Sequence, residues 1–260
     1  INFKMNKSNY KYFLNHFKKL KIQKGDNILV YSDLSKIGIV NKKLPKEILS
    51  CLKSCIGNKG TLVMPFYNFD KRKTFIFDVK KFVNSSAIGS LNKEFSKQKK
   101  IIRSNCIIHN HIGLGPSAHI LKYSSENSSL GKNSDFELFK NYNFKLLMLA
   151  CEPMQGATYL HHLEAISGVP YRKWIFLKRR KIENGLKKTV KIKYYAQKND
   201  DYIADFNPVF NKIKNNTSFL IEQSVKYGKS YIIRIKDLDK IGLNFLKKNK
   251  YSFVKKCNDK

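Results

Sequence analysis

A unit of strand, helix and strand near the start of the chain constrains the fold more than any other feature. Two apolar runs, Ile28–Tyr31 and Thr61–Met64, flank a segment with helical spacing over Pro45–Ile56. Neither run alternates with polar residues, which is typical of strands that are buried on both faces of a sheet. Strands joined through a helix usually pair in parallel, so the sequence predicts an α/β fold built around a parallel pair.

Further elements continue this layout along the chain. Helical spacing predicts helices over Ser8–Leu20, Ser90–Gln98 and about Ala157–Ser167, and strands are expected over Phe144–Cys151 and Thr189–Ala196, with a turn at Ile182–Gly185. Ser117 and Ser134 could each cap a short helix, and Tyr67–Asn84 is expected to be a loop over a cleft. No repeat or domain boundary is visible. We therefore predict one α/β domain over residues 1–260, with a mixed, largely parallel central sheet flanked by helices.

The composition limits the class of protein. The longest apolar runs, such as Leu146–Cys151, are too short to cross a bilayer, and Ile1–Tyr10 lacks the apolar core of a signal peptide. Five cysteines form no CxxC pair. We therefore expect a cytoplasmic protein with reduced thiols and no membrane partner.

The charge is strongly positive, because 51 Lys and Arg face only 19 Asp and Glu, a formal net charge of +32. Such a charge attracts nucleotides, other polyanions and acidic proteins. The basic blocks Lys178–Lys181 and Lys187–Lys193 resemble solvated faces rather than a concentrated groove, and no nucleic-acid-binding motif is present. We predict no nucleic-acid partner, with a basic nucleic-acid-binding protein as an alternative.

The segment from Glu152 to Glu164 holds the most informative polar residues. It follows the strand at Phe144–Cys151, where α/β proteins usually bind ligands, and it opens a helix. At helical spacing Thr158 and His161 share a face, and Glu164 lies beside His161 at i+3, whereas His162 falls nearer the apolar face of Tyr159, Leu163 and Ile166. A neutral imidazole held by a carboxylate is suited to removing a proton from an amine. Taken alone, the segment also fits two ordinary helix histidines.

A second polar cluster lies at Arg103–His111. His109 and His111 are spaced like metal ligands, but no carboxylate or thiolate at ligand spacing completes a site, so we predict no metal. Cys106 could be a nucleophile beside His109, although a buried inert thiol is much more common. The glycines nearby form neither a GxGxxG motif nor a Walker loop, the two common nucleotide-binding motifs.

Taken together, these segments resemble the aminoglycoside 3-N-acetyltransferase family, also called the antibiotic N-acetyltransferases. The resemblance runs from about Gly25 to Trp174, in the family's order, through Gly25–Gly38, Thr61–Pro65, the set Arg103, Ser104, His109 and Gly115, the set Leu130, Gly131 and Ser134, and the set Thr158, His161 and Glu164. Five ordered matches are more specific than any one of them. They favour an enzyme over two ordinary helix histidines.

The resemblance implies an N-acyltransferase that uses acetyl-CoA, or another acyl-CoA, as the donor. His161 would be the general base on the acceptor amine, and its carboxylate partner would be Glu164, Asp200 or Asp201. Thr158 would stabilise the tetrahedral intermediate, and transfer would be direct, without an acyl-enzyme. The donor would lie near Ser32, Asp33, Leu34, Ser35, Met64, Pro65, Phe66 and Arg103, and the acceptor near Tyr67, His109, Glu152 and Gln155.

The acceptor is predicted from a departure from the family's pattern. The family's acidic stretch after the catalytic histidine is replaced by Lys191–Tyr195, and a basic protein with few acids is a poor receptor for a polycationic aminoglycoside. We therefore predict a nucleotide-linked amino-deoxy sugar for surface polysaccharide synthesis. The alternative is an aminoglycoside, as in a resistance enzyme, which a compact acidic pocket of Asp200, Asp201, Asp205 and Glu152 would support.

The basic surface leaves a second donor open. It could dock an acidic acyl carrier protein in place of CoA. The sequence carries no signal for an oligomeric state.

Overall fold

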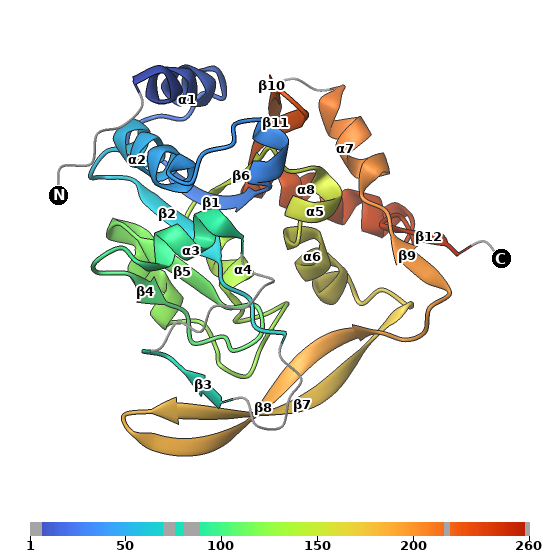
Figure 1. The fold of residues 1–260 in the computed structure, drawn as a ribbon. Helices are drawn as coiled ribbons and strands as arrows, with labels where there is room; N and C mark the ends of the chain where they lie inside the picture. Colours follow the sequence, from blue (N-terminus) through green and yellow to red (C-terminus); the bar gives the residue numbers. More distant parts are fainter. Residues whose placement is uncertain (1–6, 70–75, 81–88, 216–218, 258–260) are drawn as a thin grey trace.

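Alternate residues of the central strands face opposite sides of one sheet, and helices cover both sides (Figure 1). The computed structural model describes residues 7–69, 76–80, 89–215 and 219–257. In β1 (Asn27–Ser32), Ile28 and Val30 pack into one apolar cluster, whereas Leu29 and Tyr31 pack into another. The fold is therefore α/β with three layers, as the uninterrupted apolar runs predict.

Seven strands form the central sheet, in the order β10-β11-β6-β1-β2-β5-β4. Besides β1 they are β2 (Thr61–Pro65), β4 (Ile102–Arg103), β5 (His111–Leu114), β6 (Lys145–Leu149), β10 (Leu220–Val225) and β11 (Gly228–Arg234). β1 pairs in parallel with β2 and β6, and the other neighbours are antiparallel. The predicted mixed sheet is confirmed, but parallel pairing is limited to the three central strands and does not prevail. Its edges are antiparallel because β10 and β11, like β4 and β5, are joined by short loops.

The helices divide between the two faces. One face is covered by α1 (Lys7–Lys19), α2 (Leu44–Ile56) and α3 (Ser90–Ser96), and the other by α4 (Asp135–Asn141), α6 (Tyr159–Ser167), α7 (Asn207–Lys214) and α8 (Ile235–Lys248). The helical segments η1 (Leu34–Ile37), η2 (Pro116–Lys122) and α5 (Pro153–Gly156) lie between strands and helices. Within the described ranges, no helix combines the length and the apolar character that a membrane crossing needs.

A three-stranded sheet lies below the central one and contains two strands that the sequence did not indicate (Figure 1). It consists of β3 (Ile76–Asp78), β7 (Arg172–Glu183) and β8 (Leu186–Gln197), while β9 (Tyr202–Ala204) pairs with β12 (Val254–Lys256). The loop predicted over Tyr67–Asn84 is thus wrong at β3. Lysines and arginines interrupt the apolar alternation of β7, so the sequence pattern did not indicate that strand. The predicted turn is confirmed at Asn184-Gly185, where both residues have a positive φ.

Three local predictions need correction in whole or in part. Ser117 lies inside η2, where its N–H donates to Thr61 Oγ1 at 2.9 Å, rather than capping it. Ser134 is the N-cap residue of α4, as predicted, but its hydroxyl donates to the Gly131 carbonyl at 2.7 Å and accepts no capping hydrogen bond from a helix N–H. Ile166, expected in the core, is 50% exposed because it lies in the last turn of α6, just before the surface turn at Gly168.

Replacing Gly115 by alanine is expected to destabilise the fold by about 3 kcal/mol. Its φ is +124°, and an added Cβ would lie 2.4 Å from the Gly60 carbonyl and 2.7 Å from Thr61 Cα, both backbone atoms that cannot rotate away. Urea unfolding measures the loss. Gly168→Ala is the matched control: its φ is +62° with no atom within 4 Å, so only the backbone cost of about 1 kcal/mol is expected. Equal losses in the two variants would contradict the steric argument.

Candidate active site

The pair His161–Glu164 forms on α6 as its i,i+3 spacing predicts. His161 Nδ1 lies 2.6 Å from Glu164 Oε2. The Glu164 side chain is fully buried, whereas 26% of the His161 side chain is exposed. Because a carboxylate can only accept, Nδ1 carries a hydrogen, and in the neutral ring Nε2 then keeps a lone pair. The pair therefore presents a part-exposed imidazole base that a buried carboxylate holds in place.

Two residues that follow α6 hold the Glu164 carboxylate in place. Arg172 Nε lies 2.7 Å from Oε2, and the Tyr171 hydroxyl donates to Oε1 at 2.9 Å. Arg172 Nη2 also lies 3.1 Å from His161 Nδ1. Burial would raise the pKa of the Glu164 carboxyl, but His161, Arg172 and Tyr171 outweigh it and lower the pKa. Glu164 is thus a buried, ionised partner of His161.

The structure places the three predicted carboxylate partners of His161 differently. Asp200 and Asp201 are exposed, and Asp201 accepts from the Asn199 side chain. Glu164 is in direct contact with His161, and its catalytic role stays a prediction. Sequence reasoning missed Arg172 and Tyr171, although a phenol and a guanidinium directly after the Gly168–Pro170 turn are the available signal.

Three hydroxyl groups gather next to the start of α6. The Tyr31 and Tyr67 hydroxyls are hydrogen-bonded to each other, and each interacts with the Thr158 side chain. Burial raises the pKa of both phenols, so they stay protonated. Thr158, at the N-cap of α6, therefore belongs to a hydroxyl cluster on the helix that carries His161. The sequence singled out Thr158 and Tyr67 but not Tyr31.

The second histidine cluster is buried. His109 accepts from or donates to Ser129 Oγ at 2.5 Å, and its ring lies 5.1 Å from that of Tyr67. Burial, followed by the nearby His111 and His161, lowers the pKa of His109 to about 3. His111 Nδ1 lies 2.7 Å from Asp135 Oδ2, and both side chains are almost fully buried. No group of three or more metal-ligating side chains occurs within the described part of the chain.

Cys106 is an unreactive thiol rather than a nucleophile. It is fully buried, and burial raises its pKa. The inert alternative is therefore the one that the structure supports.

The residues predicted for the donor divide into two groups. Ser32 ends β1 and Asp33–Ser35 follow it, with Asp33 accepting from the Ser35 backbone N–H at 3.2 Å. Lys36 then donates to Gln155 at 3.2 Å, so this turn meets the Glu152–Gln155 turn before α6. The donor residues Ser32–Ser35 and the acceptor residue Gln155 are thus brought together.

The other predicted donor residues are engaged in the fold. Met64 and Phe66 are buried, and the Pro65 carbonyl accepts from Asn92 at 2.6 Å. Arg103 donates to Asn110 at 2.7 Å and to the Asp78 carbonyl at 2.8 Å, and its guanidinium lies 4.3 Å from the Phe77 ring centre. These contacts give Arg103 a structural role. Its predicted contact with the acyl donor stays a prediction.

The acids proposed for an aminoglycoside pocket are individually engaged. Glu152 accepts from the Tyr231 hydroxyl at 3.1 Å, and Asp205 accepts from the Asn207 backbone N–H at 3.1 Å. The adjacent Phe206 ring lies 5.2 Å from the His161 ring. Among the described contacts, none joins Glu152 to Asp200, Asp201 or Asp205.

His162 has a structural role and should make the fold sensitive to acid. It is buried, and its Nδ1 accepts from the Gly131 N–H at 3.1 Å, which requires a neutral ring. Burial, with Lys140 nearby, lowers its pKa to about 3 from 6.5. The unfolded chain therefore binds a proton first. Stability from this group is full above the ordinary pKa and falls by about 1.4 kcal/mol per pH unit as the pH drops toward the folded pKa.

The His162→Gln variant checks this expectation. Urea unfolding between about pH 6 and 4 should show a shallower pH dependence than in the unmodified protein, by one proton. His119→Gln is the control, since His119 is exposed. An unchanged pH dependence in His162→Gln would contradict the assignment.

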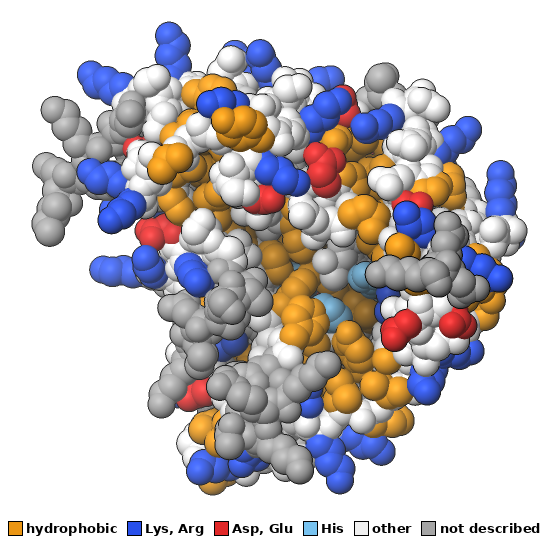
Figure 2. All heavy atoms as spheres, turned by 45° about the vertical axis from the view of Figure 1, so that its right-hand side comes forward, with side chains coloured by type: hydrophobic (Ala, Val, Ile, Leu, Met, Phe, Trp, Pro, Cys, Tyr) orange, Lys and Arg blue, Asp and Glu red, His pale blue; other side chains and the backbone are white. Residues whose placement is uncertain are grey.

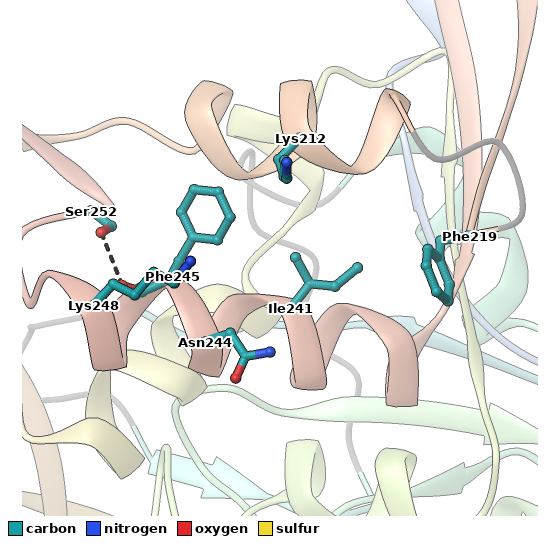
Figure 3. A pocket seen from close by; sticks show the side chains of 7 residues that line it. All are labelled: Lys212, Phe219, Ile241, Asn244, Phe245, Lys248 and Ser252. Carbon is teal, nitrogen blue, oxygen red and sulfur yellow. Dashed lines mark hydrogen bonds between the residues drawn. The ribbon is translucent and has the colours of Figure 1, made fainter.

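Figure 2 shows histidine side chains in a hollow near the centre of one face, bordered by hydrophobic side chains. A separate cavity of about 480 Å³ lies between α7 and α8. Figure 3 shows Phe219, Ile241 and Phe245 lining it, with Ser252 Oγ donating to the Phe245 carbonyl at 3.1 Å. The residues that line it include no histidine and no carboxylate, so they offer no general base of either kind.

Comparisons with known proteins show the family and the fold of the chain. Residues 29–247 match the family described as aminoglycoside 3-N-acetyltransferase. Aminoglycoside N(3)-acetyltransferase III of Acinetobacter baumannii is 28% identical over 176 residues, which are 61% of this chain and 60% of that protein. The match thus spans about three fifths of the relative's length.

Solved structures share the fold. The structure described as AAC-IIIb binary with CoASH has a TM-score of 0.79 at 16% identity, covering 92% of this chain and 96% of the other. AAC-VIa bound to sisomicin has a TM-score of 0.78 at 16% identity, covering 92% and 97%.

Proposed function

The chain belongs to the aminoglycoside 3-N-acetyltransferase family, and on that premise we propose that it transfers an acetyl group from acetyl-CoA to an amine of an amino sugar, with His161 as the general base. The observation that carries this proposal is the His161–Glu164 pair, 2.6 Å apart, with the carboxylate buried and the imidazole part-exposed. No hydrogen bond from a described residue engages His161 Nε2, so that atom is available to an acceptor.

The proposed reaction is direct. The acceptor nitrogen attacks the thioester carbonyl while His161 Nε2 takes the proton from that nitrogen. Glu164 stabilises the imidazolium that forms. The Thr158 hydroxyl is suited to donate to the oxyanion of the tetrahedral intermediate. When the carbon–sulfur bond breaks, the imidazolium returns its proton to the leaving thiolate, so the base is regenerated.

We propose that Ser32–Ser35 and Gln155 border the path of the donor to His161. The structure with CoASH is a relative of this fold, which supports acetyl-CoA as the donor here. The turn after β1 and the turn before α6 meet through Lys36 and Gln155. We propose that the donor's pantetheine arm passes along this meeting point, and that Tyr67 and Glu152 border the acceptor.

Two acceptor classes follow from different observations. The named relatives are aminoglycoside acetyltransferases, and AAC-VIa binds sisomicin, which favours an aminoglycoside. The net charge of +32 and the engaged acids favour an anionic acceptor such as a nucleotide-linked amino sugar. The relatives support the first class more directly.

Thiol release from acetyl-CoA tests the proposal. The purified protein is offered a panel of aminoglycosides and a panel of nucleotide-linked amino sugars. Blanks contain CoA in place of acetyl-CoA. We expect acceptor-dependent thiol release on at least one panel. No release on either panel would contradict the proposed activity.

A further inference from the structure

A cavity of about 580 Å³ lies between the loop before α4, the last turns of α6 and the hairpin β7–β8. Its walls include Leu130, Gly131, Lys132, Ala165, Trp174 and Lys193. The volume is within the range of roughly 300–1,000 Å³ that is usual for small-molecule sites. No prediction from the sequence assigned it a role.

Two elements place this cavity beside the His161–Glu164 pair. On α6, Ala165 follows His161 by four residues, one helical turn, and so lies on the same face. On β7, Trp174 follows Arg172 by two residues and so lies on the same side of the strand. Arg172 contacts both His161 and Glu164. The cavity therefore lies one helical turn from the proposed base, His161, and two residues along β7 from Arg172, which contacts that base.

The charged groups of the cavity are two cations, Lys132 and Lys193, and one acid, Glu137. Neither Lys132 nor Lys193 lies within 4.0 Å of a carboxylate of the described residues, and Lys193 Nζ lies 4.3 Å from the Trp174 ring centre. The acid in the lining, Glu137, already accepts from the Asn133 N–H at 2.7 Å. The cavity therefore offers two ammonium groups and an indole to a ligand.

The same face of the hairpin continues this character away from the cavity. Phe176, 58% exposed, follows Trp174 on this face, and Lys191 Nζ lies 4.2 Å from its ring centre. Alternation along the paired strands places Lys178 and Lys187 on the same face, whereas Glu183 points to the other. An anion entering the cavity meets no carboxylate from this side of the hairpin.

We propose that this cavity is the subsite for the nucleoside diphosphate part of a nucleotide-linked amino sugar, whose amine reaches His161. The proposal rests on the proposed acetyl transfer and names its acceptor class. Lys132 and Lys193 bind the phosphate oxygens, because an ammonium group forms strong, charge-assisted hydrogen bonds with phosphate. The indole of Trp174 provides an apolar surface for the base. A polycationic aminoglycoside is repelled by the same lysines.

Trp174 is the single tryptophan of the chain, so its fluorescence reports this cavity directly. Titration with UDP and with dTDP is expected to give a saturable change in emission. In the double variant Lys132→Ala/Lys193→Ala the Kd should rise by about tenfold or more, because two charge-assisted contacts are lost. Lys187→Ala is the matched control, since Lys187 lies next to the hairpin turn, and its Kd should equal that of the unmodified protein. Isothermal calorimetry provides the second readout.

Three outcomes would overturn the subsite. The first is the absence of nucleotide binding by both methods, and the second is an equal Kd in the double variant. The third is competition in which CoA excludes UDP and dTDP, since the cavity would then belong to the donor. These binding tests need no turnover. Acetylation of aminoglycosides without nucleotide binding would reject the subsite and keep the proposed reaction, whereas nucleotide binding without thiol release would do the reverse.

Discussion

Replacement of His161 by alanine is expected to lower kcat by about 10³-fold, with little change in KM. The variant removes the only group that we assign to proton removal from the amine. Its side chain is part-exposed, and its contacts to Glu164 and Arg172 are local, so the fold should persist. Thiol release measured under saturating donor gives the rate, and urea unfolding gives the stability.

His119→Ala is the control for this experiment. His119 is exposed and its ring contacts Pro116, Tyr123 and Tyr142, away from α6. It should keep the full rate. A His161→Ala enzyme that keeps more than about a tenth of the rate would exclude His161 as the base, because general-base catalysis contributes at least about 10²-fold.

Replacement of Glu164 by glutamine is expected to lower both activity and stability. The neutral amide no longer stabilises the imidazolium, so we expect kcat to fall by about 10²-fold. Arg172 would lose a buried counter-ion, and breaking such a pair costs about 3 kcal/mol. The two effects are separable, since thiol release measures the first and urea unfolding measures the second.

The pH dependence gives this variant a second signature. The pKa of Glu164 is lowered below its ordinary value of 4.5, so its carboxylate stabilises the fold above that value and loses this effect as the pH falls through the lowered pKa. Glu164→Gln should therefore lose less stability than the unmodified protein when acidified below about pH 4.5. Glu222→Gln is the control: Glu222 forms surface ion pairs with Lys229 and Lys214, whose removal should cost less than about 1 kcal/mol. Equal losses in the two variants would contradict the role of Glu164.

Local patterns predicted the central strands and the His161–Glu164 pair. β1 and β2 follow from runs that are apolar on both faces, since only a sheet covered on both sides buries them. Glu164 lies beside His161 because residues three apart on a helix are neighbours, and that geometry needs no tertiary information. The same helical spacing distinguished the packed His162 from the part-exposed His161.

Contacts between distant segments could not be predicted in this way. Tyr31 and Tyr67 meet because β1 and β2 are neighbours in the sheet, and both reach Thr158 on another element. Arg103, expected at the donor, also holds the loop that contains Asn110. Each of these pairings depends on the order of the strands, which the sequence pattern of a single strand does not encode.

The roles of individual lysines could be assigned only from their positions in the fold. The block Lys187–Lys193 resembles a solvated face in the sequence. In the fold, Lys193 lies over Trp174 in a cavity beside α6, whereas Lys188 pairs with Glu126 and Glu183. Neighbouring lysines of one strand thus differ in role because alternate side chains point to opposite faces.

Transfer of a labelled acetyl group tests the central claim most directly. The protein and its His161→Ala variant are incubated with acetyl-CoA that carries an isotopic label in the acetyl group, together with the acceptor that supports thiol release. Mass spectrometry then locates the label on the acceptor and on the intact protein. We expect label on an amine of the acceptor, none on the protein, and almost none on the acceptor with the variant. Label retained on a protein side chain, or equal transfer by His161→Ala, would contradict direct transfer with His161 as the base.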